Sequence, residues 1–140
     1  MRMGEFLETN ENFKNRKEDR IVINKESCRK LNLEKEETIA YIEKVPRKCI
    51  IKDISFCGAK IMTIGIPKFL INKKIEINFD FLDYGEAISV PGKILNADFF
   101  PGRQDISVIN VEYDVDLIPM KYKYKINDYI TTIKKNALVG

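Results

Sequence analysis

The sequence contains no histidine, and this absence removes the commonest general base of enzymes together with every Ser-His and Cys-His catalytic pair. Neither G-x-S-x-G nor the phosphate-binding G-x-x-x-x-G-K-[ST] motif occurs. The cysteines are only three, Cys28, Cys49 and Cys57, and they form no C-x-x-C pair. We therefore expect free thiols, no metal site and no catalytic activity.

Long apolar runs and a strong charge bias are also lacking. No stretch approaches transmembrane length, and residues 1–11 lack the apolar core of a secretory signal peptide. The 140 residues carry a formal net charge of +3, which is small for a protein dedicated to duplex DNA. With 44% hydrophobic and 32% charged residues, the chain has the composition of one globular domain. We expect a cytoplasmic protein with neither DNA binding nor membrane insertion.

The apolar pattern predicts short strands along most of the chain. Ile75, Ile77, Phe79 and Phe81 alternate with polar residues and give the clearest strand. Other strands are predicted over 21–23, 38–45, 49–53, 59–64, 87–97 and 109–115. Pro46 is predicted to end the second of these, and Pro91-Gly92 to bend the strand over 87–97. The charged segment 24–37 is predicted to be an irregular loop from which Leu31 and Leu33 reach the core.

After residue 118 the apolar period changes from two to that of a helix. The residues that share one helical face are Ile126, Tyr129, Ile130, Ile133 and Ala137, which predicts a helix over 119–137. The fold class that follows is mainly β, a small antiparallel β-barrel of six or seven strands with a C-terminal amphipathic α-helix.

Two short motifs stand out against this background. Arg16 and Arg20 form R-x-x-x-R, and Asp53, Ser55 and Gly58 form D-x-S-x-x-G in a predicted turn. Each arginine can grip a phosphate, or the O6/N7 edge of guanine, with two hydrogen bonds. Asp53 can accept from the N–H groups of the opposite guanine edge, Ser55 can bond a phosphate or a base, and Gly58 lets backbone approach a ligand. Together they suit a guanine-bearing anion.

The two motifs, their order and the strand pattern resemble the PilZ domain, a bacterial receptor module for cyclic di-GMP. The resemblance implies a ligand site made by Arg16, Arg20, Asp53, Ser55 and Gly58, with cyclic di-GMP as ligand and no cofactor. It divides the chain into an N-terminal arm, 1–15, and the barrel domain with its helix, 16–140. We expect ligand binding to order the arm and to signal to a downstream protein partner in motility, envelope or virulence machinery.

Other interpretations stay open at this point. The basic arm and the D-x-S-x-x-G turn could each be ordinary surface features, and the barrel could be an adaptor that has lost ligand binding. The stretch Lys121–Lys125 interleaves lysine and tyrosine, which could stack single-stranded RNA. We prefer a helix start whose tyrosine rings lie against the barrel. Two departures from the PilZ pattern are the charged segment 24–37 and the bulky Phe56-Cys57 before Gly58.

Overall fold

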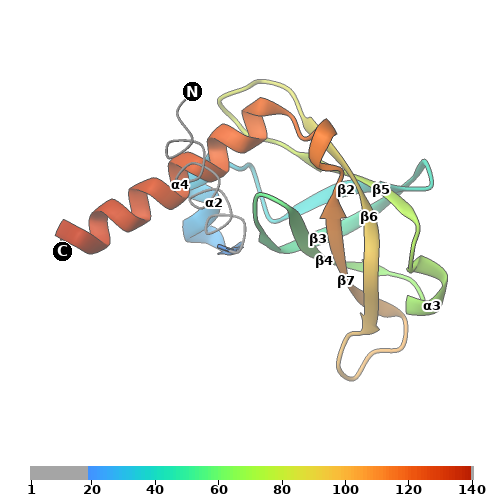
Figure 1. The fold of residues 1–140 in the computed structure, drawn as a ribbon. Helices are drawn as coiled ribbons and strands as arrows, with labels where there is room; N and C mark the ends of the chain where they lie inside the picture. The colour runs from blue at the N-terminus through green and yellow to red at the C-terminus, as the bar shows by residue number, and fades with distance from the viewer. Residues whose placement is uncertain (1–18, 140) are drawn as a thin grey trace, which may run out of the picture.

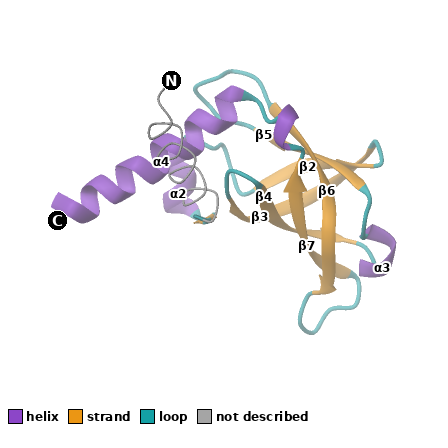
Figure 2. Ribbon diagram, viewed as in Figure 1, coloured by secondary structure: helices purple, strands orange, loops and turns teal. Residues whose placement is uncertain are grey.

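The computed structural model describes residues 19–139, in which strands dominate and a long helix closes the chain (Figures 1 and 2). The strands are β1 (Ile21–Val22), β2 (Glu37–Ile42), β3 (Val45–Ile54), β4 (Gly58–Ile64), β5 (Lys74–Phe79), β6 (Ile88–Phe99) and β7 (Ile106–Tyr113). The helices are α2 (Lys25–Leu31), α3 (Pro67–Leu70), the 3₁₀ turn η1 (Val115–Leu117) and α4 (Met120–Val139).

All pairings between these strands are antiparallel, and they close on themselves. The sheet order is β1-β3-β2-β5-β6-β7-β4, and β4 pairs again with β3. Six strands therefore form a barrel, while β1 is added outside the ring along the end of β3. This confirms the predicted small antiparallel barrel with a C-terminal helix. Closure leaves few open strand edges, so most backbone groups of the barrel are paired within the chain.

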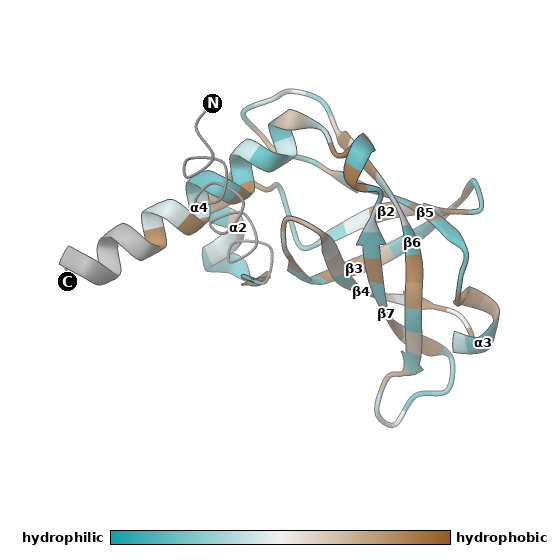
Figure 3. Cartoon of the chain, viewed as in Figure 1, coloured by the Kyte–Doolittle hydropathy of each residue, from teal (hydrophilic) through white to brown (hydrophobic). Residues whose placement is uncertain are grey.

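The apolar residues that alternate along the strands fill the barrel interior. Figure 3 shows the apolar and polar positions along the strands by colour. On β5 and just after it, Ile75, Ile77, Phe79 and Phe81 are all buried, as the alternation predicts. Helix α4 starts against one end of the barrel and then extends away from it, beside α2 (Figure 1). Its predicted apolar face is only partly buried, with Ile126 and Ile130 inside and Ile133 exposed.

The segment after β1 is a helix, so the predicted irregular loop over 24–37 is wrong for its first half. Asn24 caps α2, because its side-chain oxygen accepts from the Ser27 N–H at 2.9 Å while the Ser27 hydroxyl accepts from the Asn24 N–H at 2.9 Å. Cys28 and Leu31, one turn apart, face the core. The helix spans only 7 residues, too few for a clear apolar period in the sequence.

Two turn predictions also need correction. Pro46 does not end a strand, because Glu43 and Lys44 adopt positive φ angles of 50° and 70° and form the hairpin turn before it. Pro46 pairs with Tyr41 near the start of β3, where β4 does not yet pair on the other side. The irregularity in β6 lies between Ile94 and Asn96, whereas Pro91 and Gly92 pair in regular register with β5.

The cap of α2 generates a stability prediction. Asn24→Ala removes the side-chain acceptor for the Ser27 N–H, and we expect the free energy of unfolding to fall by about 1 kcal/mol. Asn24→Ser keeps a capping oxygen and should lie within a few tenths of a kcal/mol of the parent protein. Urea unfolding of the three proteins measures the difference. Equal losses for both variants would show that the cap does not stabilise α2.

Candidate functional site

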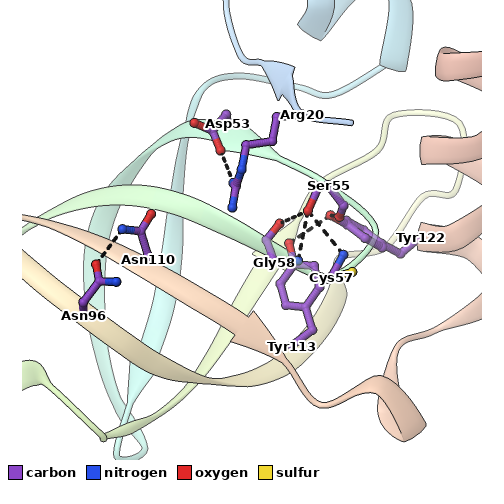
Figure 4. Close-up of polar contacts among 9 residues, drawn as sticks. All are labelled: Arg20, Asp53, Ser55, Cys57, Gly58, Asn96, Asn110, Tyr113 and Tyr122. Atoms are coloured by element: carbon purple, nitrogen blue, oxygen red, sulfur yellow. Dashed lines mark hydrogen bonds and ion pairs between the residues drawn. The ribbon is translucent and has the colours of Figure 1, made fainter. Parts of the chain in front are cut away.

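Arg20 and Asp53, which are 33 residues apart in the sequence, form an ion pair on the outside of the barrel. Arg20 lies directly before β1, and β1 pairs with β3 so that Val22 is opposite Asp53. An Arg20 guanidinium nitrogen lies 2.5 Å from Oδ1 of Asp53 (Figure 4). The pairing of β1 with β3 therefore brings together the second arginine of R-x-x-x-R and the carboxylate of D-x-S-x-x-G. The partner motif residue Arg16 lies outside the described residues.

The Arg20–Asp53 pair is accessible to solvent. The arginine side chain is 49% exposed and the aspartate side chain is 18% exposed. Ion pairs at such positions contribute about 0–1 kcal/mol to stability, because water competes with the partners. The pairing of β3 with β4 shifts register between Ile51 and Asp53, so the carboxylate lies at an irregular point of the ladder. An incoming anion or base could therefore exchange for either partner at little cost to the fold.

Ser55 makes its hydrogen bonds within its own turn. Its side chain is 2% exposed, and its oxygen accepts from the N–H groups of Cys57 at 3.3 Å and Gly58 at 3.2 Å. The hydroxyl also lies 3.3 Å from the Gly58 carbonyl oxygen, to which it can donate. Serine often plays this role in turns, because its hydroxyl can bond backbone groups that have no other hydrogen-bond partner there. The hydroxyl thus shapes the turn between β3 and β4.

Gly58 lies against the backbone of the neighbouring strand β7. A Cβ built on Gly58 would stand 2.1 Å from the carbonyl oxygen of Val111, far inside contact distance. In the ladder, Gly58 is opposite Glu112 and Ala59 is opposite Val111. The glycine is therefore required where β4 and β7 meet to close the barrel. In this structure the close backbone approach at Gly58 is between β4 and β7, two strands of the protein itself.

A buried hydrogen-bond chain joins this turn to α4. The Tyr122 hydroxyl donates to the Ser55 carbonyl oxygen at 2.6 Å, and the Tyr113 hydroxyl lies 2.9 Å from that of Tyr122 (Figure 4). Because the Tyr122 proton goes to Ser55, Tyr113 is the donor in the second bond. Burial raises the pKa of both tyrosines well above its usual value, so both stay neutral donors. Sequence reasoning had missed Tyr113 and Tyr122 as residues that support the site.

The buried position of Tyr122 also changes the interpretation of the Lys121–Lys125 stretch. Of its two tyrosines, Tyr122 is buried against the barrel, as preferred, whereas Tyr124 is 58% exposed, contrary to that preference. Lys125 pairs with Asp83 at 2.6 Å, and Lys121 lies 3.8 Å from a carboxylate oxygen of Glu86. The alternating lysine and tyrosine residues do not form a continuous stacking surface for RNA, because Tyr122 is buried and two of the three lysines, Lys121 and Lys125, face carboxylates.

Three further polar residues lie in a row with Asp53 across the outer face of the barrel. Lys60 on β4 is opposite Asp53 on one side and Asn110 of β7 on the other, and Asn110 is opposite Asn96 of β6. Nδ2 of Asn110 donates to Oδ1 of Asn96 at 2.6 Å (Figure 4). Nothing in the sequence marked these residues, because only strand register makes them neighbours.

A separate surface hollow of about 580 Å³ opens beside β2, β5 and β6. Its charged lining is mixed: Glu43, Lys44, Lys74, Glu76, Lys93, Glu112 and Asp114. None of the motif residues that the structure describes (Arg20, Asp53, Ser55 and Gly58) lines it. Within residues 19–139, no helix has the length and apolar character needed to cross a membrane, and no group of three or more acidic or cysteine side chains could hold a metal ion.

The contact between Gly58 and Val111 generates a prediction. Gly58→Ala forces the β4 and β7 backbones apart, so we expect the free energy of unfolding to fall by about 1–3 kcal/mol or more. The control is Gly102→Asn, in a loop where φ is +80° and no atom lies within 4 Å of the added Cβ. Urea unfolding compares the two variants. A Gly58→Ala protein as stable as the control would contradict the steric role.

Comparisons with known proteins place the sequence and the fold of this chain among known domains. The sequence model of the PilZ domain matches residues 14–122. A protein of Treponema denticola named cyclic di-GMP binding protein is 40% identical over 139 residues, which are 99% of this chain and 44% of that protein. The crystal structure of the Borreliella burgdorferi PlzA protein in complex with c-di-GMP superimposes with a TM-score of 0.63 at 26% identity, covering 90% of this chain and 45% of that one.

The chain thus spans less than half the length of these two relatives, and the matched part carries both motifs and the barrel. On the extent of the domain match and the closed barrel together, this chain belongs to the PilZ domain family.

Proposed function

We propose that this PilZ domain is a receptor for cyclic di-GMP, without catalytic activity, and that the ligand binds on the outer barrel face at the Arg20–Asp53 pair. The observation that carries the proposal is this pair itself, a forked cation and a carboxylate held together at the surface by the β1–β3 pairing. The Treponema relative named for cyclic di-GMP binding and the PlzA complex with c-di-GMP support the choice of ligand.

The chemistry of guanine suits both members of the pair. Guanine presents O6 and N7 as acceptors on one edge, which match the two N–H donors of an arginine fork. Asp53 offers acceptors for the guanine N–H groups on the other edge. In the free protein the two side chains satisfy each other, so the ligand would exchange one ion pair for two sets of hydrogen bonds. Adenine carries an N6 donor where guanine carries O6, so it would meet the arginine donor to donor.

The remaining motif residues have distinct proposed roles. Arg16 would supply a second fork for the ligand from the N-terminal arm, four residues before Arg20. Ser55 and Gly58 would serve the site through the turn that they form, since the serine hydroxyl bonds the turn backbone and the glycine faces β7.

Ligand titration tests the proposal. We expect the protein to bind cyclic di-GMP and to bind cyclic di-AMP far more weakly in calorimetric titrations. Arg20→Ala should weaken cyclic di-GMP binding by about fivefold to 150-fold, the value of one bidentate arginine–guanine contact. Arg20→Lys should recover only part of the loss, because lysine keeps the charge and loses the fork.

The chain offers a matched control for Arg20. Arg103 pairs with Asp105 through two contacts of 2.9 and 2.8 Å, also at an exposed position, in the loop between β6 and β7. Arg103→Ala should leave binding unchanged, and thermal melting should show that both alanine variants stay folded. Equal affinity for the two dinucleotides, or no binding of either, would overturn the proposed function.

For the signal, we propose that bound ligand orders the arm through Arg16 and that the turn reports binding to α4. Support comes from the Tyr122 hydroxyl, which links the carbonyl of Ser55 directly to the first turn of α4. A shift of the turn by the ligand would then be transmitted along the helix toward a downstream protein partner. This is a switch of the kind in which contacts to a ligand order one segment and bias another.

Hydrogen exchange measured by mass spectrometry tests this route. On addition of cyclic di-GMP, amides of residues 16–20 should exchange more slowly, and the first turns of α4 should change protection as well. Tyr122→Phe removes the bond to Ser55, so the response of α4 should be lost while that of the arm remains.

The control for Tyr122 is Tyr84→Phe. The Tyr84 hydroxyl also reaches α4, donating to the Lys121 carbonyl oxygen at 3.3 Å, but it comes from the loop after β5. This variant should keep the response of α4 to ligand. An arm whose exchange is unaffected at saturation would refute ordering, and an unchanged α4 response in Tyr122→Phe would refute the route through the turn.

A further inference from the structure

The outer barrel face carries a row of polar side chains that continues beyond the Arg20–Asp53 pair. From Asp53 the row passes to Lys60, then to Asn110 and then to Asn96, on four strands that are successive neighbours in the barrel. Directly opposite residues of antiparallel strands share a face. The residues on both sides of Lys60 and of Asn110 in their own strands (Ala59, Ile61, Ile109 and Val111) are buried, so Lys60 and Asn110 point outward, and Asn96 is itself exposed.

We infer that Lys60, Asn110 and Asn96 form a second subsite, which holds the other nucleotide half of the ligand. The inference rests on the proposed function and deepens it. With strands about 4.8 Å apart, the row extends roughly 14 Å from Asp53 to Asn96. One base held at Arg20–Asp53 would leave the two asparagines uncovered, whereas a dinucleotide has a second base to place there.

The asparagine pair is suited to a purine edge. Asn110 donates one amide hydrogen to Oδ1 of Asn96, and this bond fixes the two carboxamides relative to each other. A carboxamide carries two N–H donors and an oxygen with two lone pairs. The pair therefore still presents the Oδ1 acceptor of Asn110 and the Nδ2 donors of Asn96. Guanine offers N1–H and O6 side by side, one donor and one acceptor, as the complementary set.

Lys60 lies between the two base positions, where the dinucleotide carries phosphate. Its side chain is exposed, and no described carboxylate forms an ion pair with it. The neighbouring Asp53 is already bonded to Arg20. The ammonium group thus has no described carboxylate as partner and can pair with an anion, and a phosphate between two bases is the anion that a dinucleotide would bring to this position.

Two variants, an asparagine double variant and a lysine variant, test the subsite by titration with cyclic di-GMP. Asn96→Ala with Asn110→Ala removes the amide pair, and we expect affinity to fall by about twofold to 12-fold for each hydrogen bond lost. Lys60→Ala removes a charged contact and should weaken binding by about 12-fold to 150-fold. The dependence of log affinity on log salt should become shallower in Lys60→Ala and stay unchanged in the asparagine double variant, because only the lysine contacts phosphate.

Matched controls lie on β5, which pairs with neither β4 nor β7. They are Lys74→Ala and Asn78→Ala, and both should bind like the parent protein. Thermal melting confirms that each variant is folded. If the parent protein binds and both subsite variants stay within twofold of it, the second subsite is refuted while the proposed function stands. If the parent protein itself fails to bind, the proposed function has failed first.

Discussion

The close approach of Gly58 to the backbone of β7 is the constraint on which the rest of this structure depends. No side chain fits between Gly58 and the Val111 carbonyl, so β4 and β7 come together there and the six-stranded ring closes. Two side chains hold the turn that precedes Gly58. The Ser55 hydroxyl oxygen accepts from the Gly58 N–H, and the Tyr122 hydroxyl donates to the Ser55 carbonyl oxygen. The end of β3, and with it Asp53, is therefore held by pairing on both sides, with β4 and with β1.

This arrangement separates rigid support from exchangeable contacts. The support consists of backbone ladders and of the buried Tyr113–Tyr122–Ser55 bonds, which are costly to break because their polar groups have no access to water. The surface pair of Arg20 and Asp53 is worth at most about 1 kcal/mol and can open without loss of the fold. A receptor site benefits from this division, since a ligand replaces weak contacts while strong ones keep the geometry.

The alternation of strands was readable from the sequence wherever one face is buried. The prediction for Lys74–Phe81 succeeded because each apolar residue there points into the barrel. In the last strand Ile109, Val111 and Tyr113 are buried as predicted, whereas Val115 lies beyond β7 in the 3₁₀ turn and is exposed. The predictions failed where the apolar period carries no signal. The capped helix α2 is too short to show a helical period. The hairpin turn at Glu43–Lys44 uses positive φ angles in residues other than glycine, so its sequence does not mark a turn. Pro46 is tolerated in β3 because this part of the strand pairs only with β2, and the pairing of β3 with β4 starts at Cys49.

The sequence by itself determined the family, through the two motifs and the strand pattern around them, and the mainly β barrel with its helix, through the period of its apolar residues, because residue type and order are properties of the chain. Only the tertiary structure decided that Gly58 faces β7 and that the Ser55 hydroxyl is used within its turn. It alone placed Tyr122 beneath that turn and aligned Lys60, Asn110 and Asn96 beside Asp53. The physical reason is that strand register joins residues far apart in sequence, and register depends on turn geometry, on bulges and on which face of each strand is buried in the closed barrel.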